Sequence, residues 1–134
     1  MAKLTKVEGI GESYAEKLKA AGIETTEALL EKGGTAKGRA EIAEKTGLSP
    51  KLILRWVNHV DLFRIKGVGE EYADLLEAAG VDTVPELAQR NPDNLIKKLA
   101  EVNAVKKLVR RLPTPGQVAD WVAQAKKLPR KITH

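Results

Sequence analysis

The sequence has no cysteine, few aromatic residues and no long apolar run, and each absence excludes a class of protein. Without cysteine, the chain has no disulfide framework, no thiol nucleophile and no cysteine-ligated metal. Only 4% of the 134 residues are aromatic, whereas alanine, leucine, lysine and glutamate are abundant, which favours helices over sheets. No run approaches the roughly 18 apolar residues of a membrane span, and the first residues lack the apolar segment of a secretory leader. We therefore expect a cytoplasmic protein.

Residues suited to catalysis are scarce as well. The two histidines, His59 and His134, have no spaced partners, whereas a metal site needs several ligands. The acidic residues follow helix faces that we expect to be exposed, and no carboxylate pair stands in an apolar setting that suits acid–base chemistry. Gly9 and Gly11 lack the third glycine and the preceding strand of a dinucleotide site. We expect no enzyme, no metal and no cofactor.

What the chain does contain is one short pattern that occurs twice. Residues 7–15 return as residues 65–73, an offset of 58 positions, and in each copy two glycines stand on either side of one apolar residue. Across residues 7–30 and 65–88, 11 of 24 positions are identical. Glycine takes positive φ without a Cβ clash, so each copy predicts a tight turn between helices. The apolar residue between the two glycines should point inward.

We expect an all-α fold of two pseudo-repeated units, residues 1–64 and 65–134, whose short helices pack into one compact body. Two units of about 60 residues would each be marginal alone, which favours packing between them. Helix-start and helix-stop residues predict the boundaries. The expected helices of the first unit cover residues 12–21, 26–32, 35–47 and 50–63, and those of the second begin near residues 70, 83, 91, 103 and 114. The helix expected from Asn103 to Arg111 is short and basic.

A fainter repeat links the two helices that carry tryptophan. Residues 49–57 and 114–122 share Ser/Thr-Pro, a β-branched residue and Trp-Val at the same spacing, at an offset of 65. The apolar stripes around Trp56 and Trp121 indicate core anchors rather than ligand platforms. We expect the Trp121 helix to pack beside the first glycine pattern and the Trp56 helix beside the second.

The two glycine patterns resemble the helix-hairpin-helix family. The stretches Ala20–Thr25 and Ala78–Thr83 also resemble the N-terminal helical domain of RecA-family recombinases and the C-terminal domain of the RNA polymerase alpha subunit. Nearly the whole chain resembles an uncharacterised bacterial family of tandem helix-hairpin-helix proteins, catalogued as a domain of unknown function. These resemblances imply the fold more directly than the function.

The resemblance implies that backbone N–H groups of each turn, and of the helix start that follows, bind a nucleic-acid phosphate. Such contacts read the sugar–phosphate backbone and not the bases, so binding without sequence preference would follow. The candidate residues are Gly9, Ile10, Gly11 and Glu12 in the first copy and Gly67, Val68, Gly69 and Glu70 in the second, with Lys6 and Lys17 flanking the first and Arg64 and Lys66 flanking the second.

Acidic residues depart from the family pattern just after each turn. DNA-binding members of the family usually place lysine or arginine there, whereas this chain has Glu12, Glu16, Glu70, Glu71 and Asp74. A carboxylate a few ångströms from a phosphate opposes it by roughly 1 kcal/mol or more at intermediate dielectric. The second turn, flanked by two cations close to its glycines, is the better candidate. The alternative is that both turns serve only to pack helices.

Basic residues are concentrated towards the end of the chain. Residues 1–95 carry a net charge of −3 and residues 96–134 a net charge of +8, an asymmetry that indicates a polyanionic partner. If three or four of these cations neutralise phosphates, log K falls against log salt with a slope of about −3. The alternative is a solvated lysine face. The paired cations are Lys97–Lys98, Lys106–Lys107, Arg110–Arg111, Lys126–Lys127 and Arg130–Lys131.

The sequence thus predicts a non-enzymatic protein that binds nucleic acid without sequence preference. Duplex DNA is the expected partner, because no aromatic residue is interleaved with the cations for base stacking. The site would combine the turn amides with Lys106, Lys107, Arg110 and Arg111. The alternative is a protein–protein adaptor, with purely structural turns and a basic surface that meets an acidic partner.

Overall fold

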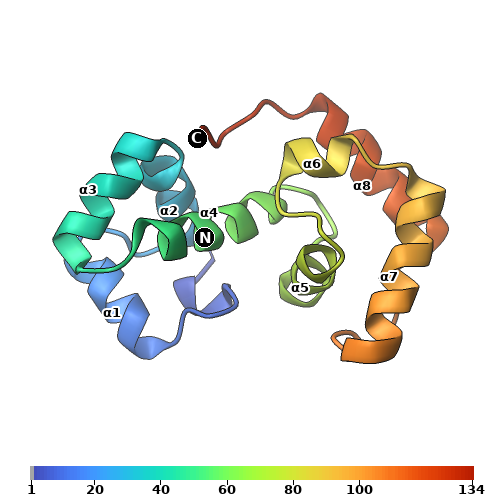
Figure 1. The fold of residues 1–134 in the computed structure, drawn as a ribbon, viewed down its shortest axis with the longest axis horizontal. Coiled ribbons are helices and arrows are strands. Elements are labelled where there is room, and N and C mark those ends of the chain that lie inside the picture. The colour runs from blue at the N-terminus through green and yellow to red at the C-terminus, as the bar shows by residue number, and fades with distance from the viewer. Residues whose placement is uncertain (1) are drawn as a thin grey trace. The chain divides into compact units, whose positions relative to one another are not determined.

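Local capping residues determine where the helices begin. The computed structural model of this chain describes residues 2–134 (Figure 1). The α-helices are α1 (Glu12–Ala20), α2 (Thr26–Gly33), α3 (Ala36–Thr46), α4 (Pro50–Leu62), α5 (Glu70–Ala78), α6 (Val84–Ala88), α7 (Pro92–Lys106) and α8 (Pro115–Lys127), preceded by a 3₁₀ turn, η1 (Leu4–Lys6). The predicted all-α fold is confirmed. Within residues 2–134 the β structure is limited to one isolated bridge between Lys3 and Thr25.

Six of these helices start at a residue whose side chain satisfies an orphan backbone N–H. The capping side chains are those of Thr25, Thr35, Ser49, Thr83, Asn91 and Thr114. Proline at the first position of α4, α7 and α8 supports the same starts, because a missing N–H costs nothing there. The sequence predicted each of these six starts, and the capping oxygens explain why.

The sequence Thr83-Val84-Pro85-Glu86 has the spacing of a capping box, but only half of the box forms. At Thr83 the hydroxyl accepts from the Glu86 N–H at 3.4 Å, whereas a return bond to the Glu86 side chain is not among the bonds of this cap. The reciprocal pair occurs instead at Thr114 and Gln117, where each side chain accepts from the other residue's backbone N–H.

The chain divides into two compact units. Unit 1 comprises residues 2–61 and 131–134, and unit 2 comprises residues 62–130. The sequence repeat predicts a boundary after residue 64 and one continuous segment for each unit. The last four residues instead return to unit 1, because Ile132 is buried and the Thr133 N–H donates to the Gly34 carbonyl at 2.7 Å.

Each unit has a core of aliphatic side chains around one tryptophan. In unit 1, α2 and α1 pack against α3, and Leu18, Ile53 and Trp56 are among the most buried side chains. In unit 2, α8 packs against α6 and α7, and α5 packs against α7. None of the helices in residues 2–134 combines the length and the apolar character that crossing a bilayer requires.

The expected exchange of tryptophan helices is wrong. Trp56 packs on the first glycine turn, since its ring centroid lies 5.2 Å from that of Tyr14. Trp121 packs on the second, since its ring lies 5.2 Å from that of Tyr72. Each tryptophan helix therefore contacts the glycine turn that precedes it in its own unit. Spacing alone correctly aligned the two helices but gave no information about which turn each contacts.

The expected short basic helix from Asn103 to Arg111 is also wrong. Asn103 lies inside α7, which continues to Lys106 and ends where Lys107 takes the left-handed conformation, with φ 51°. The Asn103 side chain binds the backbone of Val109 instead of capping a helix. Asparagine favours both a helix start and a local bond of this kind, and here the second use prevails.

A pH-dependent effect follows from Asp82, which precedes α6. Partial burial, and then the carboxylates of Glu77 and Glu86, raise its pKa above the ordinary value, and Arg90 offsets part of that rise. A raised folded-state pKa destabilises the fold above that pKa and has no effect below the unfolded-state value. Asp82→Asn should therefore raise the urea midpoint at pH 7, and the gain should vanish as pH falls below about 4.

Asp93→Asn is a matched control for this substitution. Asp93 lies in the first turn of α7, where the positive end of the helix dipole favours a negative charge. Its replacement should lower the midpoint at pH 7 slightly. A loss of stability in Asp82→Asn at pH 7 would contradict the repulsion argument.

Candidate nucleic-acid interface

The two glycine turns, residues 7–11 and 65–69, share one backbone conformation. Gly9 has φ 91° and Gly67 has φ 95°, both in the left-handed region that favours glycine. Each turn closes with a hydrogen bond, from the Ile10 N–H to the Val7 carbonyl at 3.0 Å and from the Val68 N–H to the Ile65 carbonyl at 3.1 Å. The chain thereby reverses within five residues.

The central residue of each turn is a plug, as the sequence predicted. Ile10 is 3% exposed and Val68 is 5% exposed. Their N–H groups already donate inside the turn, so these two amides are unavailable to a phosphate. The contribution of Ile10 and Val68 is to pack, and the free donors must come from the neighbouring residues.

A tryptophan ring lies next to the first glycine of each turn. A Cβ atom added to Gly9 would lie 3.4 Å from Trp56 Nε1, and one added to Gly67 would lie 3.1 Å from Trp121 Nε1. The second glycines, Gly11 and Gly69, have nothing within 4 Å of such an atom. The first glycine is therefore required for packing and conformation, while the second faces open space.

The helices that follow the two turns differ from all the others in the described chain at their N-termini. Gly11 is the N-cap of α1 and Gly69 is the N-cap of α5, and neither has a side chain that could accept a hydrogen bond. Across residues 2–134, α1 and α5 are thus the two α-helices without a side-chain cap. Within this range no hydrogen bond engages the amides of Gly11, Glu12, Gly69 or Glu70, so these donors face solvent.

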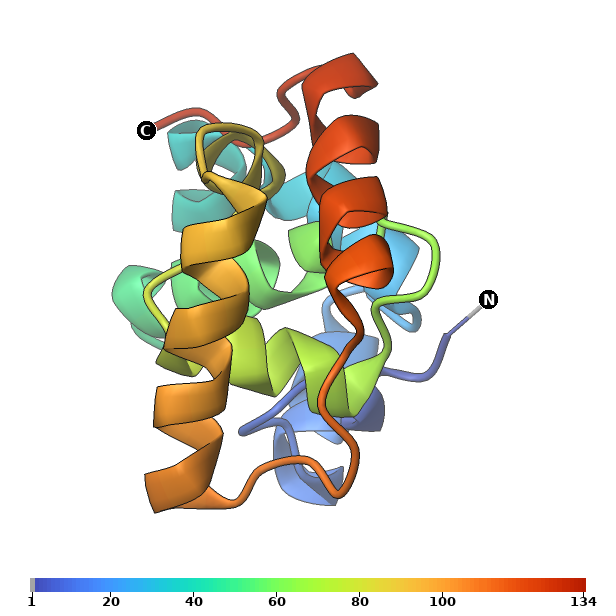
Figure 2. The ribbon, with the colours of Figure 1, turned by 90° about the vertical axis from the view of Figure 1, so that its right-hand side faces the viewer.

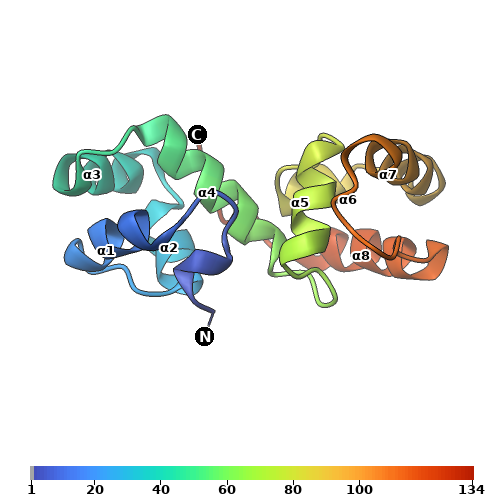
Figure 3. The same ribbon diagram turned by 90° about the horizontal axis from the view of Figure 1, so that it is seen from below.

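Side chains around the second turn divide into one that is free and one that is engaged. Lys66 is exposed, and its backbone is clasped by Gln124 of α8, which accepts from the Lys66 N–H at 2.8 Å and donates to its carbonyl at 3.1 Å. Arg64 donates to the Pro129 carbonyl at 2.6 Å. Lys66 is therefore better placed than Arg64 to contact an anion. Figure 3 shows this turn as the loop that leads into α5.

The first turn is surrounded by exposed charges of both signs. Lys6 and Lys17 are exposed beside it, and so are Glu8, Glu12 and Glu16 on the turn or on α1. The preference for the second turn stays a prediction, because Glu70 and Glu71 are exposed there as well.

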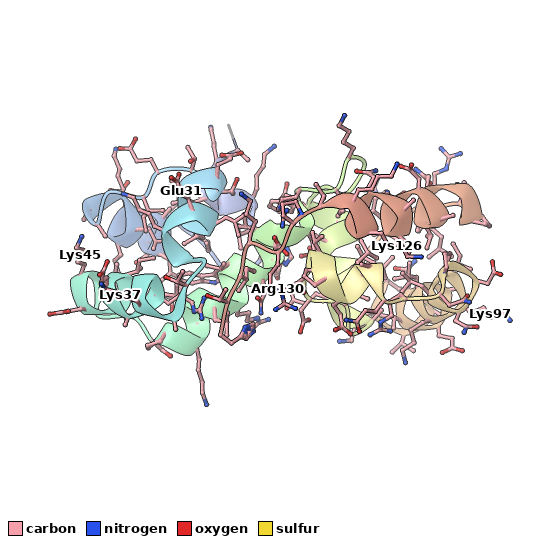
Figure 4. The ribbon with its side chains drawn as sticks, turned by 90° about the horizontal axis from the view of Figure 1, so that it is seen from above. Glu31, Lys37, Lys45, Lys97, Lys126 and Arg130 are labelled. Carbon is pink, nitrogen blue, oxygen red and sulfur yellow. The ribbon has the colours of Figure 1, made fainter. Side chains whose placement is uncertain are left out.

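The remaining candidate cations, apart from the exposed pair Arg130–Lys131 after α8, lie on three parts of the described chain. Lys97 and Lys98 are exposed on α7, and Lys126 and Lys127 are exposed in the last turn of α8. Figure 4 shows Lys97 and Lys126 projecting from their helices. The other cations, Lys106, Lys107, Arg110 and Arg111, occupy the end of α7 and the connection to α8, where all four are exposed.

We call residues 106–111 the basic segment. The Arg111 carbonyl accepts from the Tyr72 hydroxyl at 3.1 Å, and Tyr72 is the third residue of α5. The segment is therefore anchored to α5, the helix that starts at the second glycine turn. The anchoring residue, Tyr72, is two positions after Glu70, the first residue of that helix. Figure 2 shows α7 and α8 side by side, joined by the connection that contains it.

Sequence reasoning missed the residues that hold this arrangement together. Asn103 was interpreted as a helix start, and neither Tyr72 nor Gln124 had an expected role in a site. The recurrence of tyrosine at positions 14 and 72 signalled a role tied to the turn, because both copies retain the ring next to the glycines. A hydrogen bond to a residue 39 positions away has no signature in a single sequence.

The arrangement defines an all-α protein with two glycine turns, each followed by an uncapped helix. Residues 8–128 match the family described as Domain of unknown function (DUF4332), which covers nearly the whole chain, so the chain belongs to this family. Comparison with curated proteins and with solved structures gives no match.

Proposed function

We propose that this chain is a non-enzymatic protein that binds nucleic acid, with duplex DNA as the expected partner, without preference for base sequence. Its glycine turns act as helix-hairpin-helix elements, of the kind found in RecA-family recombinases. The contact is to phosphates, made by backbone amides at the starts of α1 and α5 and by nearby cations. Such contacts carry affinity and orientation but no sequence information.

The observation that carries this proposal is the exposed, uncapped start of α1 and α5. Across residues 2–134 the other six α-helices have side-chain caps, whereas the two helices after the glycine turns have no hydrogen bond to their first N–H groups. Open N–H groups at the positive end of a helix dipole form a ready site for an anion. The Gly69 backbone is extended, with φ −100° and ψ −163°, as at the side-chain caps, so a capping residue would fit there.

The second turn should bind more strongly than the first. Lys66 is exposed beside it, and the basic segment is anchored to α5 through Tyr72. The first turn has exposed Lys6 and Lys17 among three exposed glutamates, and unit 1 has no counterpart of the basic segment. Glu70 and Glu71 still oppose a phosphate, and they limit affinity to the weak range typical of sequence-independent contacts.

A salt titration with random-sequence duplex DNA tests the proposal. Binding should be measurable at 50 mM salt, and log K should fall with log salt at a slope of about −3 or steeper, since each neutralised phosphate contributes about −0.9. Fluorescence anisotropy of a labelled duplex provides the measurement. Absence of binding at 50 mM salt would refute it.

Glu70→Pro compared with Glu70→Gln tests the amides themselves. Proline is tolerated at the first helical position and removes one N–H, and the extended Gly69 before it suits a proline. Both substitutions remove the same charge, so they differ in the donor. We expect Glu70→Gln to bind DNA more tightly than the natural chain. Glu70→Pro should bind about tenfold more weakly than Glu70→Gln, because a charge-assisted hydrogen bond contributes about 1.5 kcal/mol.

The equivalent pair at the first turn, Glu12→Pro and Glu12→Gln, provides the comparison between sites. A smaller difference is expected there than at residue 70. Equal affinities for Glu70→Pro and Glu70→Gln would show that the α5 amide does not contact the phosphate, even if the natural chain binds DNA.

A second candidate function is supported by two exposed apolar side chains next to the cations. Val105 is 82% exposed and Leu112 is 41% exposed, and they flank the basic segment at its two ends. Apolar side chains beside unneutralised cations suit an acidic protein partner. A protein adaptor of this kind would give no binding in the DNA titration.

A further inference from the structure

The connection between α7 and α8 is the main difference between the two units. The starts of α3 and α4 are 14 residues apart, at positions 36 and 50, whereas those of α7 and α8 are 23 apart, at positions 92 and 115. The nine additional residues lengthen α7 and add most of the connection 107–114. The four cations of the basic segment belong to this added region, so the first unit has no counterpart to them.

Hydrogen bonds from inside unit 2 fix the middle of the basic segment. Asn103 Oδ1 accepts from the Val109 N–H at 3.0 Å, and Asn103 Nδ2 donates to the Val109 carbonyl at 3.0 Å. The Lys107 N–H donates to the Asn103 carbonyl at 2.9 Å. The Val109 side chain is 7% exposed and belongs to the core of the unit. Val109 is thus buried and hydrogen-bonded through both its N–H and its carbonyl, and Leu108 packs against the same core, while the four cations of the segment are exposed.

Tyr72 fixes the far end of the segment. Its hydroxyl donates to the Arg111 carbonyl at 3.1 Å, and its ring is held against Trp121, which is 2% exposed. Figure 3 shows the same connection passing beside α5. The segment is therefore anchored by α7 at one point and by α5 at the other.

The cations that this frame presents are unneutralised. Lys106, Lys107, Arg110 and Arg111 are all exposed, and no ion pair within the described residues engages any of them. A segment held in place before binding loses less conformational entropy when it binds than a flexible tail does. Four fixed cations without counter-charges suit a polyanion.

We infer that the basic segment is a preorganised phosphate-binding element, found in unit 2 and absent from unit 1, and that Asn103 and Tyr72 are its positioning residues. This inference rests on the proposed function and extends the phosphate site at the second glycine turn along the duplex backbone. Duplex is the expected form, because both tryptophans are buried and no aromatic ring lies within the segment for base stacking.

A pair of fourfold variants tests the location of the contact. The test variant replaces Lys106, Lys107, Arg110 and Arg111 with glutamine. The matched control replaces Lys19, Lys37, Lys45 and Lys51, four exposed lysines of unit 1, with glutamine. Figure 4 shows Lys37 and Lys45 projecting from α3. Both variants lose four positive charges, so the position of the charge is what differs.

The salt slope for duplex DNA should become flatter by about 3 in the test variant, since each lost phosphate contact removes about 0.9. In the control variant it should change by less than about 1. Equal changes in both variants would overturn the inference and leave the proposed function standing. Failure of the natural chain to bind DNA would instead refute the proposed function. Loss of binding to polyglutamate but not to DNA in the test variant would assign the segment to an acidic protein and overturn the inference.

Tyr72→Phe tests the positioning role with little change to the fold. It removes the hydroxyl and keeps the ring against Trp121, and Tyr14→Phe is the matched control in unit 1. We expect Tyr72→Phe, and Asn103→Ala, to weaken DNA binding about three- to tenfold, and Tyr14→Phe to leave it unchanged.

The two kinds of variant should not be additive. If Tyr72 acts through the segment, then Tyr72→Phe should have no further effect on DNA binding once the four cations are glutamine. If Tyr72 only stabilises the fold, Tyr72→Phe should weaken DNA binding both in the natural chain and in the fourfold glutamine variant, and that result would overturn the positioning role. Equal affinities for Tyr72→Phe and Tyr14→Phe would overturn it as well.

Discussion

Trp121→Ala should lower the free energy of unfolding of unit 2 by about 3–5 kcal/mol, the usual cost of truncating a buried tryptophan. Trp121 is 2% exposed, and its ring contacts both Tyr72 and the backbone of the second glycine turn. Its removal leaves a cavity under Gly67 that the turn cannot fill without losing its conformation. A unit of this size has a total stability of about 3–10 kcal/mol, so we expect it to unfold largely or completely at 37 °C.

Urea unfolding followed by far-UV circular dichroism measures this loss. The chain has two tryptophans, one in each unit, so in Trp121→Ala the fluorescence of Trp56 reports on unit 1 in the same sample. Leu112→Ala is the control, because Leu112 is 41% exposed and its truncation should change stability by less than about 0.5 kcal/mol. A change for Trp121→Ala as small as that of the control would contradict the packing described for the second turn.

Arg39→Ala should lower the free energy of unfolding by about 2–4 kcal/mol, from charge-assisted hydrogen bonds lost and carbonyls left without a donor. Arg39 is 4% exposed. Its guanidinium donates to the Gly33 carbonyl at 2.9 Å and to the Thr133 carbonyl at 2.7 Å. One side chain thus joins the end of α2 to the returning residues 131–134.

The control for this substitution is Lys37→Ala on the same helix. Lys37 is exposed, and its truncation should leave the urea midpoint unchanged within about 0.5 kcal/mol. Hydrogen exchange offers a second measurement, because the Thr133 N–H donates to the Gly34 carbonyl and should lose protection in Arg39→Ala. Unchanged protection would mean that residues 131–134 are held without Arg39.

The features predicted best from the sequence are those that depend on neighbouring residues. Threonine or asparagine before a helix predicted the starts of α2, α6, α7 and α8, and proline in the first turn supported the last three of them. The paired glycines predicted positive φ at residues 9 and 67, because few other residues adopt it. Ile10 and Val68 were correctly predicted as buried, since an apolar residue between two glycines has no other favourable environment.

The features that escaped prediction join residues far apart in the chain. The tryptophan helices match each other in sequence, but their spacing does not encode which turn each one contacts. Asn103 favours a helix start as much as a bond to a following loop, and the geometry of Val109 decides between them. The N–H groups of Ile10 and Val68 were predicted as phosphate donors, and a hydrogen bond inside each turn removes them from that role. Whether the remaining donors bind phosphate stays a prediction.

The return of residues 131–134 to unit 1 has a consequence for how the protein can be divided in the laboratory. Unit 1 is assembled from two segments separated by 69 residues of chain. An N-terminal fragment that ends between the two copies of the glycine pattern would lack Ile132 and the Thr133 carbonyl, one of the two acceptors of Arg39. Both missing groups lie within residues 131–134, so a peptide that carries these residues would supply them. A single cut between residues 61 and 62, or between residues 130 and 131, would separate the two segments of unit 1. Both segments would stay in the sample, so unit 1 could reassemble from them.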